Sequence, residues 1–491
     1  MTTVVPSRGD SVTIGFLFNL LGRSVTLVGG GLVSIILARH YKPELFGQWA
    51  VASVYATMVG TIVDGGLGRL LVRDAARDPA NAGAALGRVL KGRGLLAALV
   101  VPAALVLAWF QVSEPAAWWL VFTLVLARLT TDGLGTLSSA LYAFDRFRIS
   151  NLLETWRRSG LVLATLLIVW LDLGLHWVAV ASLLLALSGS RWLLLEVKKV
   201  LRFDFSRSIR ENAGDAFWFW MSGIFFWING EIDQLMLSRM TGDRTTGIYA
   251  AAVRLVALSY VLPRAVNDTV IRRLFRSAKD GQGLNRQLHT TVMILGGLGA
   301  MAGVLLYFFG PQLIGLVYGV SFEASGPILS VYGIFLALFF IRSGPSWFLT
   351  SSDRVPLATL YLASACALNI GLNLWLIPKY QGLGAAWSTV CSEAVLFSFF
   401  VGTALLMNGG RLAIAILLSI VPAGVAVVAC LLLPASWEWP ARLALATLLA
   451  GSALTSGAWA LRRGWNPLGL MDDPPQTPPP PIRPIETDPG T

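Results

Sequence analysis

Charged residues are scarce in this chain of 491 amino acids. They make up 13% of the sequence, whereas hydrophobic residues make up 55% and the mean hydropathy is +0.67. A water-soluble protein of this length needs far more charge to cover its surface. The composition therefore excludes a soluble globular protein and indicates a membrane protein.

Residues that support metal, disulfide or nucleotide chemistry are also few. The chain has three cysteines and three histidines, and the cysteines fall inside apolar runs, which predicts buried free thiols rather than disulfides or a metal site. No GxxxxGK[ST] phosphate-binding pattern is present, which excludes ATP hydrolysis by this chain. We therefore expect no catalytic residues, no metal and no bound cofactor, and do not expect an enzyme.

What the chain has in abundance is apolar runs long enough to cross a bilayer. A helix needs about 20 apolar residues to span a hydrocarbon core about 30 Å thick. We predict an all-α polytopic membrane protein with about 14 transmembrane helices. The predicted runs are 14–38, 47–67, 94–111, 117–141, 158–171, 176–196, 215–238, 246–268, 289–317, 326–350, 355–377, 382–408, 411–434 and 441–461.

Basic residues are distributed unequally between the two sets of connecting loops. One set, which includes both chain ends, carries most of the 38 lysines and arginines. The opposite set carries only Arg39, Lys42, Arg239, Arg244, Lys379 and Arg442. The positive-inside rule places the basic set, and both termini, in the cytoplasm. Because the net charge of +11 resides in short loops between spans, it does not indicate a nucleic-acid partner.

Two stretches 200 residues apart repeat one another without a gap. The identical residues are Leu37 and Leu237, Arg39 and Arg239, Gly47 and Gly247, Ala50 and Ala250, and Ala52 and Ala252. Both stretches begin at the end of one apolar run, cross a short polar turn and enter the next. A two-fold repeat of membrane helices is a common plan of secondary transporters, with the substrate path between the halves.

Five arginines lie within predicted spans, where an ionisable side chain is costly and faces a partner or a watery cavity. They are Arg23, Arg128, Arg254, Arg264 and Arg342. Guanidinium groups in a cavity would suit a phosphate or pyrophosphate, which they grip with bidentate hydrogen bonds. These five residues are therefore the candidate substrate-binding residues.

The alternative is that each arginine belongs to a structural ion pair. Arg128 has Asp132, and Arg264 has Asp268, one helical turn away. Glu231 and Asp233 lie at a depth similar to that of Arg254. Asp64 is a candidate partner for Arg23, and Glu393 for Arg342. Both interpretations stay open at this point.

Acidic residues at depth suggest coupling to an ion gradient. Asp64, Asp233 and Glu393 are the candidates, because a carboxylate in a low-dielectric site can bind H⁺ or Na⁺ and link its movement to that of a substrate. The alternative is that these acids only neutralise the arginines.

Several pieces of the sequence, in order along the chain, resemble the Wzx-type polysaccharide and O-antigen flippases. These belong to the multidrug/oligosaccharidyl-lipid/polysaccharide exporter superfamily. The matching pieces are Ile36–Gly47, Val63–Leu67, Glu231–Asp233, Gly247–Ala252, Leu316–Gly319, Leu372–Pro378 and Gly384–Trp387. This family has no invariant catalytic signature, so the match identifies the fold better than the substrate.

The resemblance implies two pseudo-symmetric six-helix lobes around a central cavity that opens alternately to either side. The lobes would be residues 1–200 and 201–408, followed by two further helices in 409–464, which can shape a groove for a lipid tail, and a disordered Pro-rich cytoplasmic tail in 465–491. Arg23 corresponds to a basic position in the first helix of this superfamily. The other arginines are assigned by depth and charge alone.

The sequence thus favours a flippase in the bacterial cytoplasmic membrane. Its substrate would be a polyprenyl-pyrophosphate-linked oligosaccharide for O-antigen, capsule or exopolysaccharide synthesis, and a polysaccharide polymerase and chain-length machinery are candidate partners. A drug/cation antiporter of the same superfamily is the first alternative, although unpaired arginines disfavour a cationic substrate. A membrane polymerase or ligase acting on the same lipid-linked sugars is the second, but such proteins generally carry a large external loop, which this chain lacks.

Overall fold

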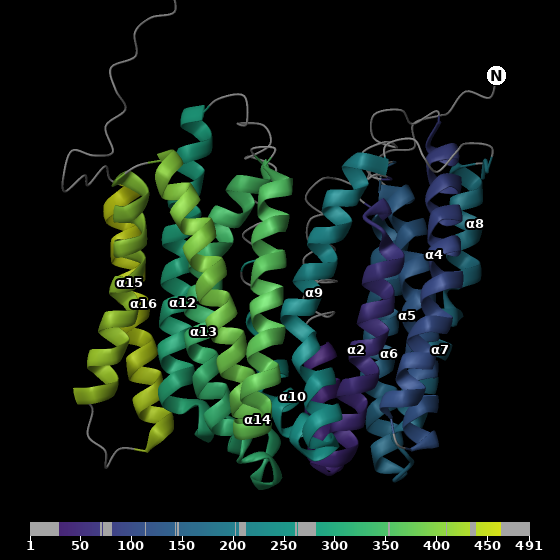
Figure 1. The fold of residues 1–491 in the computed structure, drawn as a ribbon, viewed down its shortest axis with the longest axis horizontal. Helices are drawn as coiled ribbons and strands as arrows, with labels where there is room; N and C mark the ends of the chain where they lie inside the picture. Colours follow the sequence, from purple (N-terminus) through teal and green to yellow (C-terminus); the bar gives the residue numbers. More distant parts are fainter. Residues whose placement is uncertain are drawn as a thin grey trace, which may run out of the picture.

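The computed structural model consists of long helices packed side by side in two bundles (Figure 1). It describes residues 29–462 apart from 69–70, 72–80, 113, 143, 145–146, 202, 206–212, 261–262, 264–280, 352–353, 409 and 433–437. No strand occurs in these residues, so the predicted all-α class is confirmed for the part of the chain that is described.

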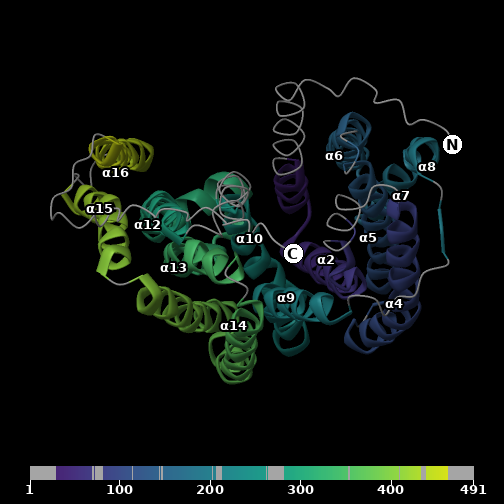
Figure 2. The ribbon, with the colours of Figure 1, turned by 90° about the horizontal axis from the view of Figure 1, so that it is seen from above.

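The two bundles follow the order of the chain, as Figure 2 shows from above. The N-terminal bundle contains α2 (Pro43–Asp64), α4 (Ala82–Gln111), α5 (Pro115–Tyr142), α6 (Phe147–Trp170), α7 (His176–Ser188) and α8 (Ser190–Val200). The C-terminal bundle contains α9 (Ala213–Thr241), α10 (Asp243–Ser259), α12 (Gly281–Tyr318), α13 (Ser325–Ser351) and α14 (Val355–Asn408). Beyond it, α15 (Gly410–Leu432) and α16 (Trp439–Arg462) pack against α12.

The lengths of the helices agree with a multi-pass membrane protein. Seven of the helices found among the described residues are long and apolar enough to cross a bilayer. The longest, α14, covers two predicted runs and leaves helical geometry at Gln381, where φ is 51° and ψ is −130°. Pro378 lies three residues before this break. The total of 14 spans and the division into six-helix lobes stay predictions.

Some boundaries and exposures differ from the sequence-based expectation. Helix α6 is much longer than the predicted run 158–171, and α4 begins at Ala82 instead of residue 94. Both helices start in polar segments that hydropathy assigns to loops. Cys366 is buried as predicted, but Cys391 is exposed.

The two bundles meet where the repeated stretches lie, through close contact between α2 and α10. A Cβ atom added to Gly47 would lie 1.9 Å from the carbonyl oxygen of Asp243, and one added to Gly247 would lie 1.9 Å from that of Pro43. The 200-residue offset of the repeat turns one contact into the other, since Gly47 corresponds to Gly247 and Pro43 to Asp243. The interface is therefore self-complementary, like that of a two-fold dimer. The repeat therefore marks the contact between the bundles as well as two corresponding hairpins.

Polar side chains hold the same end of the molecule together. Arg39 lies in the helical residues 29–40 and donates to the carbonyl oxygens of Leu316 and Val317 at the end of α12, the latter at 2.7 Å. Arg244 lies 3.4 Å from its repeat counterpart Glu44. These cross-bundle contacts lie on the side that the basic loops avoid, and they close the bundles against each other there.

Substitution of Gly47 by alanine tests the bundle contact. We expect Gly47→Ala to lower the free energy of unfolding by about 1–3 kcal/mol, because the added methyl group pushes α2 away from α10. Thermal unfolding in detergent measures this. Gly371→Ala is the matched control, because its added Cβ meets no atom within 4 Å. Equal melting temperatures for the two variants would show that α2 and α10 do not rely on this close approach.

Candidate functional site

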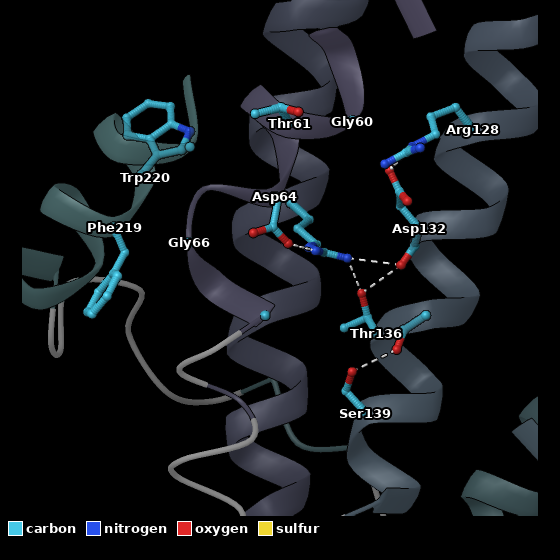
Figure 3. Close-up of a pocket in the computed structure, with 14 residues that line it drawn as sticks. Gly60, Thr61, Asp64, Gly66, Arg128, Asp132, Thr136, Ser139, Phe219 and Trp220 are labelled. Atoms are coloured by element: carbon cyan, nitrogen blue, oxygen red, sulfur yellow. Dashed lines mark hydrogen bonds and ion pairs between the residues drawn. The ribbon is translucent and has the colours of Figure 1, made fainter. Parts of the chain in front are cut away.

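A polar cavity lies between α2, α4, α5 and α9 (Figure 3). Its volume is about 430 Å³, which is within the range of small-molecule sites, about 300–1,000 Å³. Polar side chains of α2, α4 and α5 line one part of it, and Phe219 and Trp220 of α9 line another. Residues of both bundles thus line the cavity.

Arg93 of α4 holds three helices together at this cavity. It forms an ion pair with Asp64, the last residue of α2, and it donates to the Thr136 hydroxyl and, at 3.0 Å, to the Asp132 carbonyl oxygen of α5. The Arg93 side chain is only 14% exposed, whereas that of Asp64 is 41% exposed. The guanidinium group is therefore fixed in the wall, and the carboxylate faces the space.

A second arginine comes from α5. Arg128 donates from Nε to the carboxylate of Asp132 at 2.8 Å, one helical turn along the same helix (Figure 3). Gly60 of α2 makes room for this pair, since an added Cβ would lie 2.5 Å from the Asp132 carboxylate. Arg128 is 41% exposed, and its terminal nitrogens have no hydrogen-bond partner among the described residues. It presents free donors to the cavity.

The aromatic side of the cavity ties α9 to α2. Trp220 donates from Nε1 to the carbonyl oxygen of Ile62 at 2.9 Å, and Trp227 donates to the Thr57 hydroxyl at 3.2 Å. These bonds orient the two indole rings at the junction between the bundles. The charged wall is therefore supplied by the N-terminal bundle and the aromatic wall by the C-terminal bundle.

Two of the predicted residues pair with each other away from this cavity. Arg342 of α13 forms a bidentate ion pair with Glu393 of α14, and both side chains are only 5% exposed. Phe339 and Phe400 cover the guanidinium group, with ring centroids 5.2 and 5.4 Å from it. The structural ion pair that the sequence left open is thus present here, and it joins two helices of the C-terminal bundle.

Asp233 lies in a separate buried cluster of the C-terminal bundle. Its carboxylate accepts hydrogen bonds from the Tyr249 hydroxyl, from Thr389 at 3.2 Å and from the backbone nitrogen of Gln234 at 2.8 Å. Tyr249 in turn lies 2.5 Å from the Tyr332 hydroxyl. The cluster joins α9, α10, α13 and α14, and no cationic side chain in the described residues forms an ion pair with Asp233.

Of the three remaining predicted arginines, the structure describes Arg254. Arg254 is half-buried in α10 and interacts electrostatically with Glu231, so it lies away from the cavity lining. Arg23 and Arg264 lie outside the described residues. Of the eight predicted site residues, Arg128 and Asp64 are therefore brought together at the cavity.

The sequence reasoning missed Arg93. Hydropathy assigned residues 68–93 to a cytoplasmic loop, yet α4 already begins at Ala82 and carries Arg93 into the bundle. The signal that was overlooked is the run of small residues at its start, in which Gly83, Ala84, Ala85 and Gly87 are all buried. Such small residues typify close helix packing, which a hydropathy window does not register.

Comparisons with known proteins agree with this architecture. The sequence model of the family described as polysaccharide biosynthesis protein matches residues 12–275. A structure of the lipid II flippase MurJ, in an inward closed conformation, superposes with a TM-score of 0.68 at 15% identity, covering 91% of this chain and 99% of the other. No curated protein matches the chain.

Two multidrug transporter structures are also similar. An inward-facing MATE family transporter of the MOP superfamily gives a TM-score of 0.59 at 15% identity, covering 79% of this chain and 95% of the other. A MATE protein in complex with MaD3S gives a TM-score of 0.56 at 16% identity, covering 81% of this chain and 95% of the other. At these identities the likeness establishes the fold and leaves the substrate open.

The Arg342–Glu393 pair generates a testable prediction. Arg342→Met alone should cost about 3–5 kcal/mol of stability, because it leaves a buried carboxylate without a partner. The double variant Arg342→Met/Glu393→Leu should recover most of this loss, since it removes both charges. Thermal unfolding of the two single variants and the double variant measures the coupling. Strictly additive losses would show that the two side chains act independently.

Proposed function

Because the chain belongs to the polysaccharide biosynthesis protein family, we propose that it is a flippase for a polyprenyl-pyrophosphate-linked oligosaccharide. It moves this repeat unit from the cytoplasmic to the outer leaflet of the bacterial cytoplasmic membrane by alternating access. The product feeds the synthesis of a cell-surface polysaccharide such as O-antigen, capsule or exopolysaccharide. A polymerase and chain-length machinery receive it there.

The observation that carries this proposal is the convergence of Arg93 and Arg128 on one cavity. They come from different helices, α4 and α5, and both line the same space. Two guanidinium groups match the two phosphates of a pyrophosphate, which they bind through charge-assisted hydrogen bonds. Phe219 and Trp220, which face them, offer apolar rings against which a sugar can pack.

Alternating access agrees with the contacts between the bundles. The close contact of Gly47 with Gly247 lies near the start of α2, and Asp64 at the cavity lies at its other end. The bundles are therefore joined on the side that the basic loops avoid, while the cavity lies towards the side that carries them. Under the positive-inside rule this is the cytoplasmic side, with both termini on it.

A drug/cation antiporter is the second candidate. Asp64 and Asp132 line the same cavity, and carboxylates suit a cationic substrate. However, each of these carboxylates is paired with an arginine, so neither is free to bind a cation, whereas Arg128 still has donors for an anion. This arrangement favours an anionic head group over a cation. A polymerase or ligase is less favoured, because the chain lacks the large external loop of such proteins.

We further propose that Asp233 couples transport to a gradient of H⁺ or Na⁺. Asp233 is 1% exposed, and hydroxyl and amide donors hold its carboxylate instead of a cation, so its charge needs another partner. A proton or a sodium ion supplies that partner. Glu393 is less suited to this role, because Arg342 already neutralises it.

Replacement of the two cavity arginines tests the substrate site. We expect Arg93→Ala and Arg128→Ala each to reduce export at least about tenfold, since a hydrogen bond to a charged group contributes about 1.5–3 kcal/mol. Cell-surface polysaccharide in a complemented deletion strain measures export, and immunoblotting checks the amount of protein in the membrane. Arg191→Ala, at an exposed position of α8, should export normally. Normal export by both cavity variants would remove this cavity from the substrate path.

The coupling proposal is tested with Asp233→Asn. Asparagine has nearly the same size and keeps one acceptor oxygen, but it can neither take up a proton nor neutralise a cation, so transport should lose its response to an ion gradient. Transport by proteoliposomes under imposed H⁺ and Na⁺ gradients measures this, with the exposed Glu323→Gln as the charge-matched control. If Asp233→Asn still responds to the gradients as the unaltered protein does, coupling resides elsewhere.

A further inference from the structure

Among the described residues that line the cavity, there are as many carboxylates as guanidinium groups. Asp64 and Asp132 balance Arg93 and Arg128, so this part of the lining carries no net positive charge to hold an anion. We propose that Asp64 is a built-in competitor of the pyrophosphate head group. Its ion pair with Arg93 breaks when the head group binds and re-forms when the head group leaves. This inference rests on the function proposed above and assigns to Asp64 the release of the substrate.

The two acids differ in a way that assigns this role to Asp64. Asp132 pairs with Arg128 one turn away on the same helix, so helix movements do not separate them. The Asp64–Arg93 pair joins α2 to α4. Because α2 also contacts α10 through Gly47, a shift of α2 relative to α4 during transport would change the distance between Asp64 and Arg93. The pair is therefore placed to break and re-form during transport.

The local structure makes Asp64 the movable partner. Arg93 stays anchored by Thr136 and the Asp132 carbonyl oxygen even without Asp64. Asp64 occupies the last position of α2, where the helix dipole disfavours a carboxylate, so that Arg93 is the group that retains it. Gly65 and Gly66 follow with φ of 58° and 69°, which residues with a side chain rarely adopt. Asp64 thus lies beside two glycines at which the backbone changes direction.

The exchange also has a suitable energetic balance. A phosphate that displaces Asp64 replaces one charge-assisted hydrogen bond to Arg93 by another, so only the free donors of Arg128 contribute a net gain. The affinity for the head group therefore stays moderate. When the head group leaves, the Asp64 carboxylate pairs with Arg93 again, so the guanidinium group in the cavity wall is not left without a counter-charge. A carrier needs both properties, because a head group held too tightly would not be released.

The experiment uses the full chain, purified in detergent, and two probes: inorganic pyrophosphate and geranylgeranyl pyrophosphate. We expect Asp64→Asn to bind both probes at least about tenfold more tightly than the unaltered protein in calorimetric titrations. In cells the same variant should export less polysaccharide, because release becomes slow. Asp64→Ser is the second variant, and thermal unfolding verifies that each is folded. Glu323→Gln makes the same change in net charge at an exposed site and should bind as the unaltered protein does.

The outcomes separate this inference from the proposed function. If the unaltered protein binds the probes and Arg128→Ala does not, but neither Asp64 variant binds more tightly, the competitor role of Asp64 is wrong and the head-group site stands. Equal tightening by Glu323→Gln, or undiminished export by Asp64→Asn, would also contradict the role. If neither the unaltered protein nor any Asp64 variant binds the lipid probe, the proposed head-group site itself fails.

Discussion

A guanidinium group inside a helical bundle is tolerated only when a carboxylate compensates its charge, and this constraint organises both bundles. In the C-terminal bundle, Arg342 and Glu393 satisfy it completely, with both side chains buried and aromatic rings over the guanidinium group. At the cavity, Arg93 and Arg128 satisfy it with carboxylates that remain partly accessible. The same interaction therefore serves packing in one bundle and leaves room for a ligand in the other.

Helix α2 links this electrostatic arrangement to the contact between the bundles. Near its start, Gly47 allows the backbones of α2 and α10 to touch, and its last residue, Asp64, reaches Arg93. Between them, Gly60 lets the Arg128–Asp132 pair pack against the helix. One helix thus carries both the contact between the bundles and one wall of the cavity.

The sequence predicted the features that depend on local spacing and on composition. The all-α class and the correspondence of two hairpins follow from periodicity and the repeat, and the four-residue spacing of Arg128 and Asp132 offered their pairing as one of two interpretations. The structure confirms these features, and the family resemblance is supported by the match over residues 12–275. The partner of Asp64 could not be found in this way. Arg93 lies in a polar, small-residue stretch that hydropathy assigns to a loop, and its contact with Asp64 depends on how α2 packs against α4.

The central claim is that the chain moves a lipid-linked oligosaccharide across the membrane. It is tested most directly by the location of that lipid in a strain from which the gene is deleted. In spheroplasts, the account predicts that the oligosaccharide accumulates on the cytoplasmic leaflet, where an externally added sugar-binding probe cannot reach it until the membrane is permeabilised. Accumulation on the outer leaflet, with full labelling of intact spheroplasts, would contradict the claim.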